Sequence, residues 1–182
     1  MWESEFDKYC RQTIETFGAE VKQILPDDVV TSDWVRWKCQ YGCPGYGRGY
    51  SCPPHSPSPD QTRAVLNEYS RALLFHLELR EEDGKNRREK SISFLEHLVT
   101  LEGEMFKDGY YKAFIFLAGP CHLCEECASL TGAPCKFAMK ARPSMEACGI
   151  DVYQTARTNG FPIEPLKQKG DPRNQYCLML VD

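Results

Sequence analysis

Long apolar runs are missing from this sequence of 182 residues. Its longest uninterrupted apolar stretches are a few residues, whereas a helix needs about 20 to span a bilayer. Residues 1–7 are acidic and lack a basic segment before an apolar run, so they do not have the pattern of a secretory signal. We therefore expect a cytoplasmic protein with no membrane partner.

An excess of positive charge is also missing. The chain has 22 Lys and Arg against 26 Asp and Glu, which gives a formal net charge of -4. Nucleic-acid surfaces normally need a concentrated basic patch, so we expect no nucleic-acid partner. A hydrophobic content of 42% and a charged content of 26% are typical of globular proteins. This length suits a single domain, predicted over residues 1–182.

Cysteine, in contrast, is abundant, with ten residues in the chain. In a reducing compartment such thiols are metal ligands or catalytic groups more often than disulfides. Cys10 and Cys177 lie in apolar patterns and are predicted to be core residues. The others fall into two cysteine loops, residues 39–54 and 119–148. They are the predicted metal ligands and would suffice for two four-ligand sites: Cys39, Cys43, Cys52, Cys121, Cys124, Cys127, Cys135 and Cys148.

The second loop carries the more specific spacing. Cys121, Cys124 and Cys127 are three residues apart and follow an apolar run that is predicted to be a strand. Bacterial ferredoxins use this spacing to hold three irons of one cube, with the fourth ligand coming from elsewhere. Structural zinc sites instead pair two well-separated C-x2-C turns. The spacing favours an iron–sulfur cluster over zinc, and Cys135, Cys148 or a histidine would complete the site.

The first loop is less specific. Residues 39–54 contain four glycines and three prolines, which suit a loop folded closely around an inorganic centre. The loop does not discriminate between iron–sulfur and zinc. Tyr46 stands where a radical S-adenosylmethionine enzyme would have its third cysteine, which excludes that class. His55 is the better candidate for a substituted ligand, and His122 is more typical of a residue beside the metal. No cysteine–histidine pair is marked as a nucleophile and its base, so no catalytic residue is predicted.

Periodicity and turn residues predict an α+β or α/β fold. We expect a mixed sheet of four or five strands flanked by helices, with the cysteine-rich loops at one edge. Capping boxes are predicted at Ser58–Gln61 and Asn86–Glu89, a helix cap at Asp151 with Gln154, and a solvated turn at 81–85. The predicted helices are 2–25, one from Ser58, 86–109 and 151–160, with a short helical turn over 143–149. The predicted strands are 29–37, 72–79, 112–117 and a closing hairpin of 163–166 and 176–181.

Several motifs together resemble a known family. They are Val35–Cys39, Cys52–Pro54, Gly119–Cys127, Pro134–Cys135 and the segment 142–152. As a set they are similar to the uncharacterised "predicted metal-binding protein" family, domain of unknown function 2284. The resemblance implies metal binding and no established reaction. It also implies an origin mainly among anaerobic bacteria and archaea, which suits oxygen-sensitive clusters.

The function predicted from these observations is that of an iron–sulfur protein with one or two [4Fe–4S] clusters. It would transfer electrons to a protein redox partner, with cysteine thiolates as the iron ligands. One alternative is a zinc-stabilised protein-interaction module. Another is a cluster-dependent enzyme with an open iron site, acting near Arg48, Tyr50 or His55.

Overall fold

The computed structural model describes residues 6–80, 86–168 and 170–182. Its α-helices are α1 (Asp7–Phe17), α2 (Asp33–Gly42), α3 (Pro59–Leu66), α4 (Arg87–Lys107) and α5 (Val152–Thr158). The strands are β1 (Glu20–Ile24), β2 (Ala72–Leu79), β3 (Phe114–Phe116) and β4 (Arg173–Leu180), and short 3-10 helices are η1 (Pro26–Asp28), η3 (Ala128–Thr131) and η4 (Glu146–Cys148). The fold is α+β. Among these residues, no helix is both long and apolar enough to cross a membrane.

The four strands form one sheet in the order β1-β2-β4-β3, and each neighbouring pair is antiparallel. The predicted strand number is confirmed, but the predicted mixed pairing is wrong. The strands β2 and β3, joined through α4, run in the same direction, yet the C-terminal strand β4 lies between them and pairs with both. No parallel pair of named strands therefore forms.

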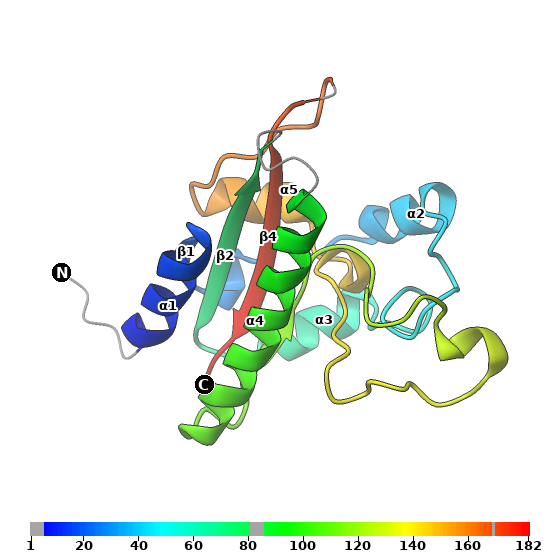
Figure 1. Cartoon of the computed structure of the whole chain (residues 1–182), viewed down its shortest axis with the longest axis horizontal. Coiled ribbons are helices and arrows are strands. Elements are labelled where there is room, and N and C mark those ends of the chain that lie inside the picture. The colour runs from blue at the N-terminus through cyan, green and yellow to red at the C-terminus, as the bar shows by residue number, and fades with distance from the viewer. Residues whose placement is uncertain (1–5, 81–85, 169) are drawn as a thin grey trace.

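Helices cover both faces of this sheet (Figure 1). On one face α1 and α4 pack against residues such as Phe75 and Met179, and on the other α3 and α5 pack against Leu74 and Leu178. Alternate residues of a strand point to opposite faces, so β2 and β4 supply both cores. The predicted strand 72–79 is confirmed with the same bounds. Cys177 is completely buried, as predicted.

The predicted helix 2–25 is too long. Residues 1–5 lie outside the described part, and α1 ends at Phe17 because Gly18 adopts a left-handed conformation, φ 65°, and caps it. Glycine adopts this conformation without steric cost. The residues that follow form β1, which pairs with β2 in the register Glu20↔His76 to Ile24↔Ala72. Strand pairing thus overrides the helical period in this segment.

The predicted strand 29–37 is wrong, because its second half belongs to helix α2. Val35 is the buried residue of this helix, while Trp34 and Trp37 are 45% and 65% exposed. Aromatic and β-branched residues favour strands only when they pack on a sheet. Here the helix is held by Arg36, whose guanidinium donates to the carbonyl oxygens of Pro57 (2.6 Å) and Ala147 (3.0 Å).

The capping predictions are confirmed in part. Ser58 and Gln61 form the predicted capping box at α3, and Asp151 caps α5 through the N–H of Gln154. Asn86 is the N-cap residue of α4, but its side chain makes no capping hydrogen bond. The capping box predicted at Asn86–Glu89 is therefore wrong. The turn predicted at 81–85 lies outside the described residues.

The N-terminal strand of the predicted closing hairpin, 163–166, is also wrong. The nearby chain is held by a local turn instead, because the Asp171 carboxylate accepts hydrogen bonds from the N–H groups of Lys167 and Gln168. Such side-chain bonds offer the backbone an alternative to strand pairing.

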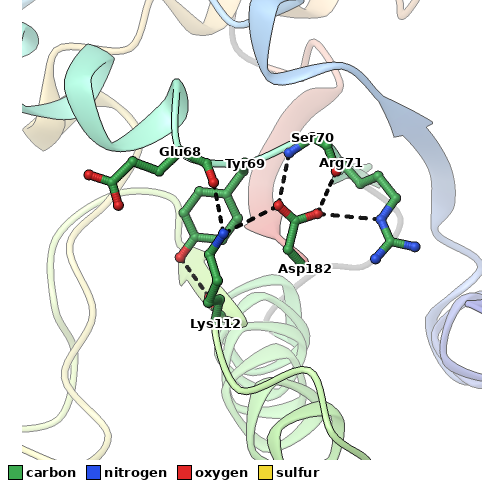
Figure 2. Close-up of polar contacts among 6 residues, drawn as sticks. All are labelled: Glu68, Tyr69, Ser70, Arg71, Lys112 and Asp182. Carbon is green, nitrogen blue, oxygen red and sulfur yellow. Dashed lines mark hydrogen bonds and ion pairs between the residues drawn. The ribbon is translucent and has the colours of Figure 1, made fainter.

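A network around Asp182, just after β4, holds the α3–β2 and α4–β3 connections together at one end of the sheet (Figure 2). Its carboxylate accepts hydrogen bonds from the N–H and hydroxyl of Ser70 (2.9 and 2.7 Å) and from Arg71 (3.4 Å) and Lys112 (3.4 Å). Burial alone would raise the pKa of Asp182, but these hydrogen bonds outweigh it and hold the pKa below 3.8. The network therefore favours the ionised carboxylate.

Asp182→Asn is expected to lower the free energy of unfolding by about 1 kcal/mol near pH 7. The effect is modest because Asp182 and the basic side chains that contact it are partly exposed. A carboxylate whose pKa is lower in the folded than in the unfolded protein stabilises the fold at pH values above its unfolded pKa. This stabilisation is lost as the pH falls through the pKa of the folded state. The difference from wild type should therefore shrink below pH 3.8. Urea unfolding at several pH values measures it, with the exposed Asp27→Asn as the control. A pH-independent difference would contradict the prediction.

Candidate metal centre

The second cysteine loop leaves and returns to the fold at one place. Leu117, directly after β3, donates its N–H to the carbonyl of Pro143 (2.9 Å) and accepts from the N–H of Met145 (2.8 Å). Next to this junction, Arg142 forms a partly buried ion pair with Glu102 of α4, at 2.6 Å between Nη2 and Oε1. The ends of the loop are therefore fixed to the core, while Cys121, Cys124, Cys127 and Cys135 lie outside both apolar cores.

The first cysteine loop is anchored to the same region. Cys39 lies in the last turn of α2 rather than at a strand end, and Cys43 is the C-terminal capping residue. After the loop, the Ser56 hydroxyl donates to the carbonyl of Ala147 at 2.6 Å. Arg36 donates to the same carbonyl. Residues 143–148, far along the chain from the first loop, thus position both loops.

The two loops also contact each other directly. The Tyr50 hydroxyl donates to the carbonyl of Ala133 (2.8 Å), and the Ser129 hydroxyl donates to the carbonyl of Arg48 (3.1 Å). Between the loops lies a cavity of about 370 Å³, here called the cysteine cavity. The thiols that line it come from both loops and are Cys52, Cys121, Cys124, Cys127 and Cys135. Leu123, Leu130 and Phe137 form apolar parts of its wall.

The thiols of this region influence one another electrostatically. Burial raises the pKa of Cys52, and the nearby Cys43, Cys39, Cys121 and Cys127 raise it further. Burial and then Cys43 likewise raise the pKa of Cys39. Like charges that oppose ionisation of one another are stabilised when a cation binds among them. Seven of the eight predicted ligands, all except Cys148, therefore lie where the two loops meet.

Two glycines of the first loop lie against cysteine sulfur atoms. A Cβ atom at Gly45 would lie 3.6 Å from Cys43 Sγ, and one at Gly49 would lie 3.7 Å from Cys52 Sγ. Across residues 6–80, 86–168 and 170–182, no three His, Cys, Asp or Glu side chains are arranged to hold one metal ion. The donors themselves nevertheless fit a soft metal or a cluster, because thiolates dominate the cavity.

The comparison with protein families decides the identity. The profile described as "Predicted metal-binding protein (DUF2284)" matches residues 22–181, which include both cysteine loops. The chain belongs to this family. No curated protein and no solved structure matches it. Metal binding is therefore the family property, with the metal left unspecified, and the predicted resemblance is confirmed.

In this DUF2284 protein hydrogen bonds lower the pKa of Cys127 and so favour its thiolate. The Ser129 hydroxyl, whose one hydrogen is shared between Cys127 Sγ and the Arg48 carbonyl, lowers the pKa of Cys127 most. The N–H groups of Ser129 and Tyr50 lower it further. Hydrogen bonds to the charged form of a group favour that form. Both loops thus contribute to stabilising this one sulfur.

Ser129→Ala is expected to slow alkylation of Cys127 by iodoacetamide roughly fivefold near neutral pH, since one hydrogen bond of about 1 kcal/mol is lost. The pKa rises, so the thiolate fraction falls at a given pH. Rates in the metal-free protein are measured by peptide mass spectrometry across a pH series. Thr131→Ala is the matched control, because its hydroxyl donates to the Ala128 carbonyl instead. Equal slowing in both variants would contradict the assigned role of Ser129.

Five of the ten cysteines do not line the cysteine cavity. Cys39 and Cys43 are close enough to Cys52 to raise its pKa, whereas the other three lie in or against the apolar cores. Cys148 has no exposed surface and packs in the core beside α3, and burial raises its pKa to about 12. Burial also raises the pKa of Cys10 to about 11 and that of Cys177 well above its usual value. Cys10 is partly buried against the other core. The ligand role predicted for Cys148 stays a prediction, and its surroundings resemble those of the core cysteines.

The two histidines considered as ligands differ in position. His55 stacks edge-to-face with Tyr50 at a centroid distance of 5.7 Å. His122 follows Cys121, and its Nε2 lies 3.8 Å from Glu96 Oε1, beyond hydrogen-bonding distance. Nε2 is buried without a partner among the described residues.

Glu146 is a polar group that sequence analysis missed. Burial raises its pKa, while its own N–H, the Ser144 hydroxyl and the N–H of Gly119 oppose the rise. Its Oε2 is shielded from solvent and has no hydrogen-bond partner in the described part of the chain. It lies near Cys39 and Cys148 as well. The sequence signal was weak, because an acidic residue in a short helical turn is normally exposed.

Proposed function

We propose that this protein holds one or two [4Fe–4S] clusters and transfers electrons to a protein redox partner in the cytoplasm. The observation that supports this most is the cysteine cavity, which is lined by thiols of both loops. The ferredoxin-like spacing of Cys121, Cys124 and Cys127 favours iron–sulfur over zinc. When bound, a cluster supplies a one-electron redox centre.

Each surrounding group has a distinct part in this proposal. Cys121, Cys124, Cys127 and Cys135 would hold one cluster, and Cys39, Cys43 and Cys52 would hold part of a second. Ser129 would favour the thiolate of Cys127, since its hydrogen bonds already lower that pKa. The apolar wall of Leu123, Leu130 and Phe137 would limit the access of water, which influences the reduction potential.

The exposed aromatic residues of α2 support a protein partner. Trp37 and Tyr41, four residues apart on this helix, are 65% and 80% exposed. The helix carries Cys39 in its last turn. Tyrosine and tryptophan are enriched where proteins bind one another. An electron partner that contacts α2 would therefore lie next to the first cysteine loop.

The test is anaerobic purification followed by measurement of iron, acid-labile sulfide and zinc per chain. About eight irons and eight sulfides would mean two cubes, and about four would mean one. Dithionite should bleach the visible absorbance and produce an electron paramagnetic resonance signal. Zinc without sulfide would overturn the proposal and leave a structural zinc module. That alternative has less support, because the chain already buries two apolar cores.

A further inference from the structure

A second cavity, of about 460 Å³, lies between α4 and the second cysteine loop. We call it the α4 groove. The residues of α4 that line it form one face of the helix, because they recur every three or four positions from Leu95 through Val99 and Gly103 to Lys107. Twelve residues of helix separate the first from the last, which is about 18 Å. The groove therefore has the volume of a small-molecule site and an elongated shape.

The opposite wall of the groove comes from two parts of the second cysteine loop. Arg142 pairs with Glu102, so the late part of the loop lies beside the C-terminal turns of α4. His122 Nε2 lies 3.8 Å from Glu96 Oε1, so the start of the loop lies beside an earlier turn of the same helix. The groove thus runs along α4.

The lining of the α4 groove is mostly apolar, and part of it is open to solvent. Val99, Ala118 and Leu123 are half-buried, and Met139 at the rim is 88% exposed. Apolar surface that the protein itself leaves uncovered is typical of binding sites. Methionine is also flexible enough to adapt to a ligand. These residues would therefore contact the apolar part of a ligand.

Gly103 removes a side chain from the α4 wall of the groove. It lies inside the helix, where alanine would be more stable, and its φ is outside the left-handed region. Apart from its chain neighbours and the backbone of its own helix, no heavy atom of the described residues lies within 4 Å of a Cβ atom placed there. Neither the backbone nor the packing requires glycine at this position. The missing side chain instead leaves room for a ligand.

The two ends of the α4 groove differ in charge. Lys107 of α4 and Lys140 of the loop are exposed at one end, and neither side chain has a hydrogen bond or ion pair among the described residues. Glu104, one turn before Lys107, offsets one of these charges and leaves a net positive charge. The other end carries the exposed Glu96. An anionic group is therefore favoured at the lysine end and disfavoured beside Glu96.

We propose that the α4 groove binds a medium-chain aliphatic carboxylate. The carboxylate lies between Lys107 and Lys140, and the chain extends past Gly103 and Val99 toward Leu123. The elongated shape favours a flexible chain over a single ring, and the lysines favour a carboxylate over an amine or an alcohol. This binding goes beyond the iron–sulfur proposal and does not rest on it, because none of these contacts is made by a predicted metal ligand.

The test is isothermal titration calorimetry of the purified chain with decanoate, hexanoate, decylamine and 1-decanol as probes. Decanoate is expected to bind roughly tenfold more tightly than hexanoate, because its longer chain buries more apolar surface along the groove. It should also bind roughly tenfold more tightly than decylamine or 1-decanol, which cannot pair with the lysines. Iron and sulfide are measured on the same preparations, so failure of the iron–sulfur proposal is distinguishable from failure of this one.

Gly103→Leu fills the groove without removing a side-chain contact of the fold. It should weaken decanoate binding by roughly tenfold or more. Thermal unfolding should occur at the same or a higher temperature, since leucine is a better helix former than glycine. Ser93→Leu is the matched control, because Ser93 is exposed on α4 but does not line the groove. It should leave decanoate binding unchanged.

The double variant Lys107→Gln, Lys140→Gln tests the charged end, and its exposed positions keep the test valid if Gly103→Leu does not fold. It should weaken decanoate binding roughly tenfold and leave 1-decanol binding unchanged. Lys136→Gln is the control, because this exposed lysine of the same loop does not line the groove. The inference is overturned if decanoate does not bind at millimolar concentration, if Gly103→Leu binds it as wild type does, or if the lysine variant loses decanoate and 1-decanol equally.

Discussion

Changing Cys121 and Cys124 together to serine is expected to remove at least one complete cluster, about four irons and four sulfides per chain. Serine keeps the size of the side chain but replaces the soft thiolate that iron prefers. Both sulfurs line the cysteine cavity, and neither belongs to the two apolar cores. The loss should therefore appear as missing metal and visible absorbance, with the far-ultraviolet circular dichroism retained.

The matched control is Cys10→Ser, which changes a free thiol of α1 that is partly buried against one of the apolar cores. It should keep the full iron and sulfide content. Cys148→Ala tests the remaining predicted ligand: unchanged iron would remove Cys148 from the ligand set. Full metal content in the Cys121→Ser, Cys124→Ser double variant would show that the metal is not held in the cysteine cavity.

Gly149→Ala is expected to destabilise the fold by about 2–4 kcal/mol. Gly149 ends η4 with φ 76°, in the left-handed region, where an L-residue is strained. A Cβ atom there would also overlap Pro59 at the first position of α3, at 2.4 Å from its Cγ. Either α3 or η4 would have to move, although both cysteine loops depend on residues 143–148 for their position. Urea unfolding of the purified variant measures the effect.

Gly132→Ala separates the backbone strain at a left-handed residue from the overlap with Pro59. Gly132 ends η3 with φ 69°, but nothing lies within 4 Å of a Cβ atom there. Only the backbone strain of about 1–2 kcal/mol applies at this position. Equal destabilisation by the two substitutions would show that contact with Pro59 has no role. Gly149→Ala should also reduce iron content, because η4 holds Arg36 and Ser56 through the carbonyl of Ala147.

The sequence by itself determined the features that depend on local chemistry. The capping box at Ser58 and the cap at Asp151 could be predicted, because each is a contact over three residues. The strand 72–79 was predictable because six of its eight residues are apolar, and the metal-binding family from the cysteine motifs and their surroundings. These signals are short in range, so no knowledge of distant contacts was needed.

The tertiary structure decided the features that depend on partners far along the chain. Residues 20–24 form a strand because β2 offers an edge, and α2 forms where a strand was expected because Arg36 is held by Pro57 and Ala147. The placement of Glu146 and the meeting of the two cysteine loops also required the fold. Spacing along the chain fixes which residues can bind a metal, but only long-range packing decides which of them lie side by side.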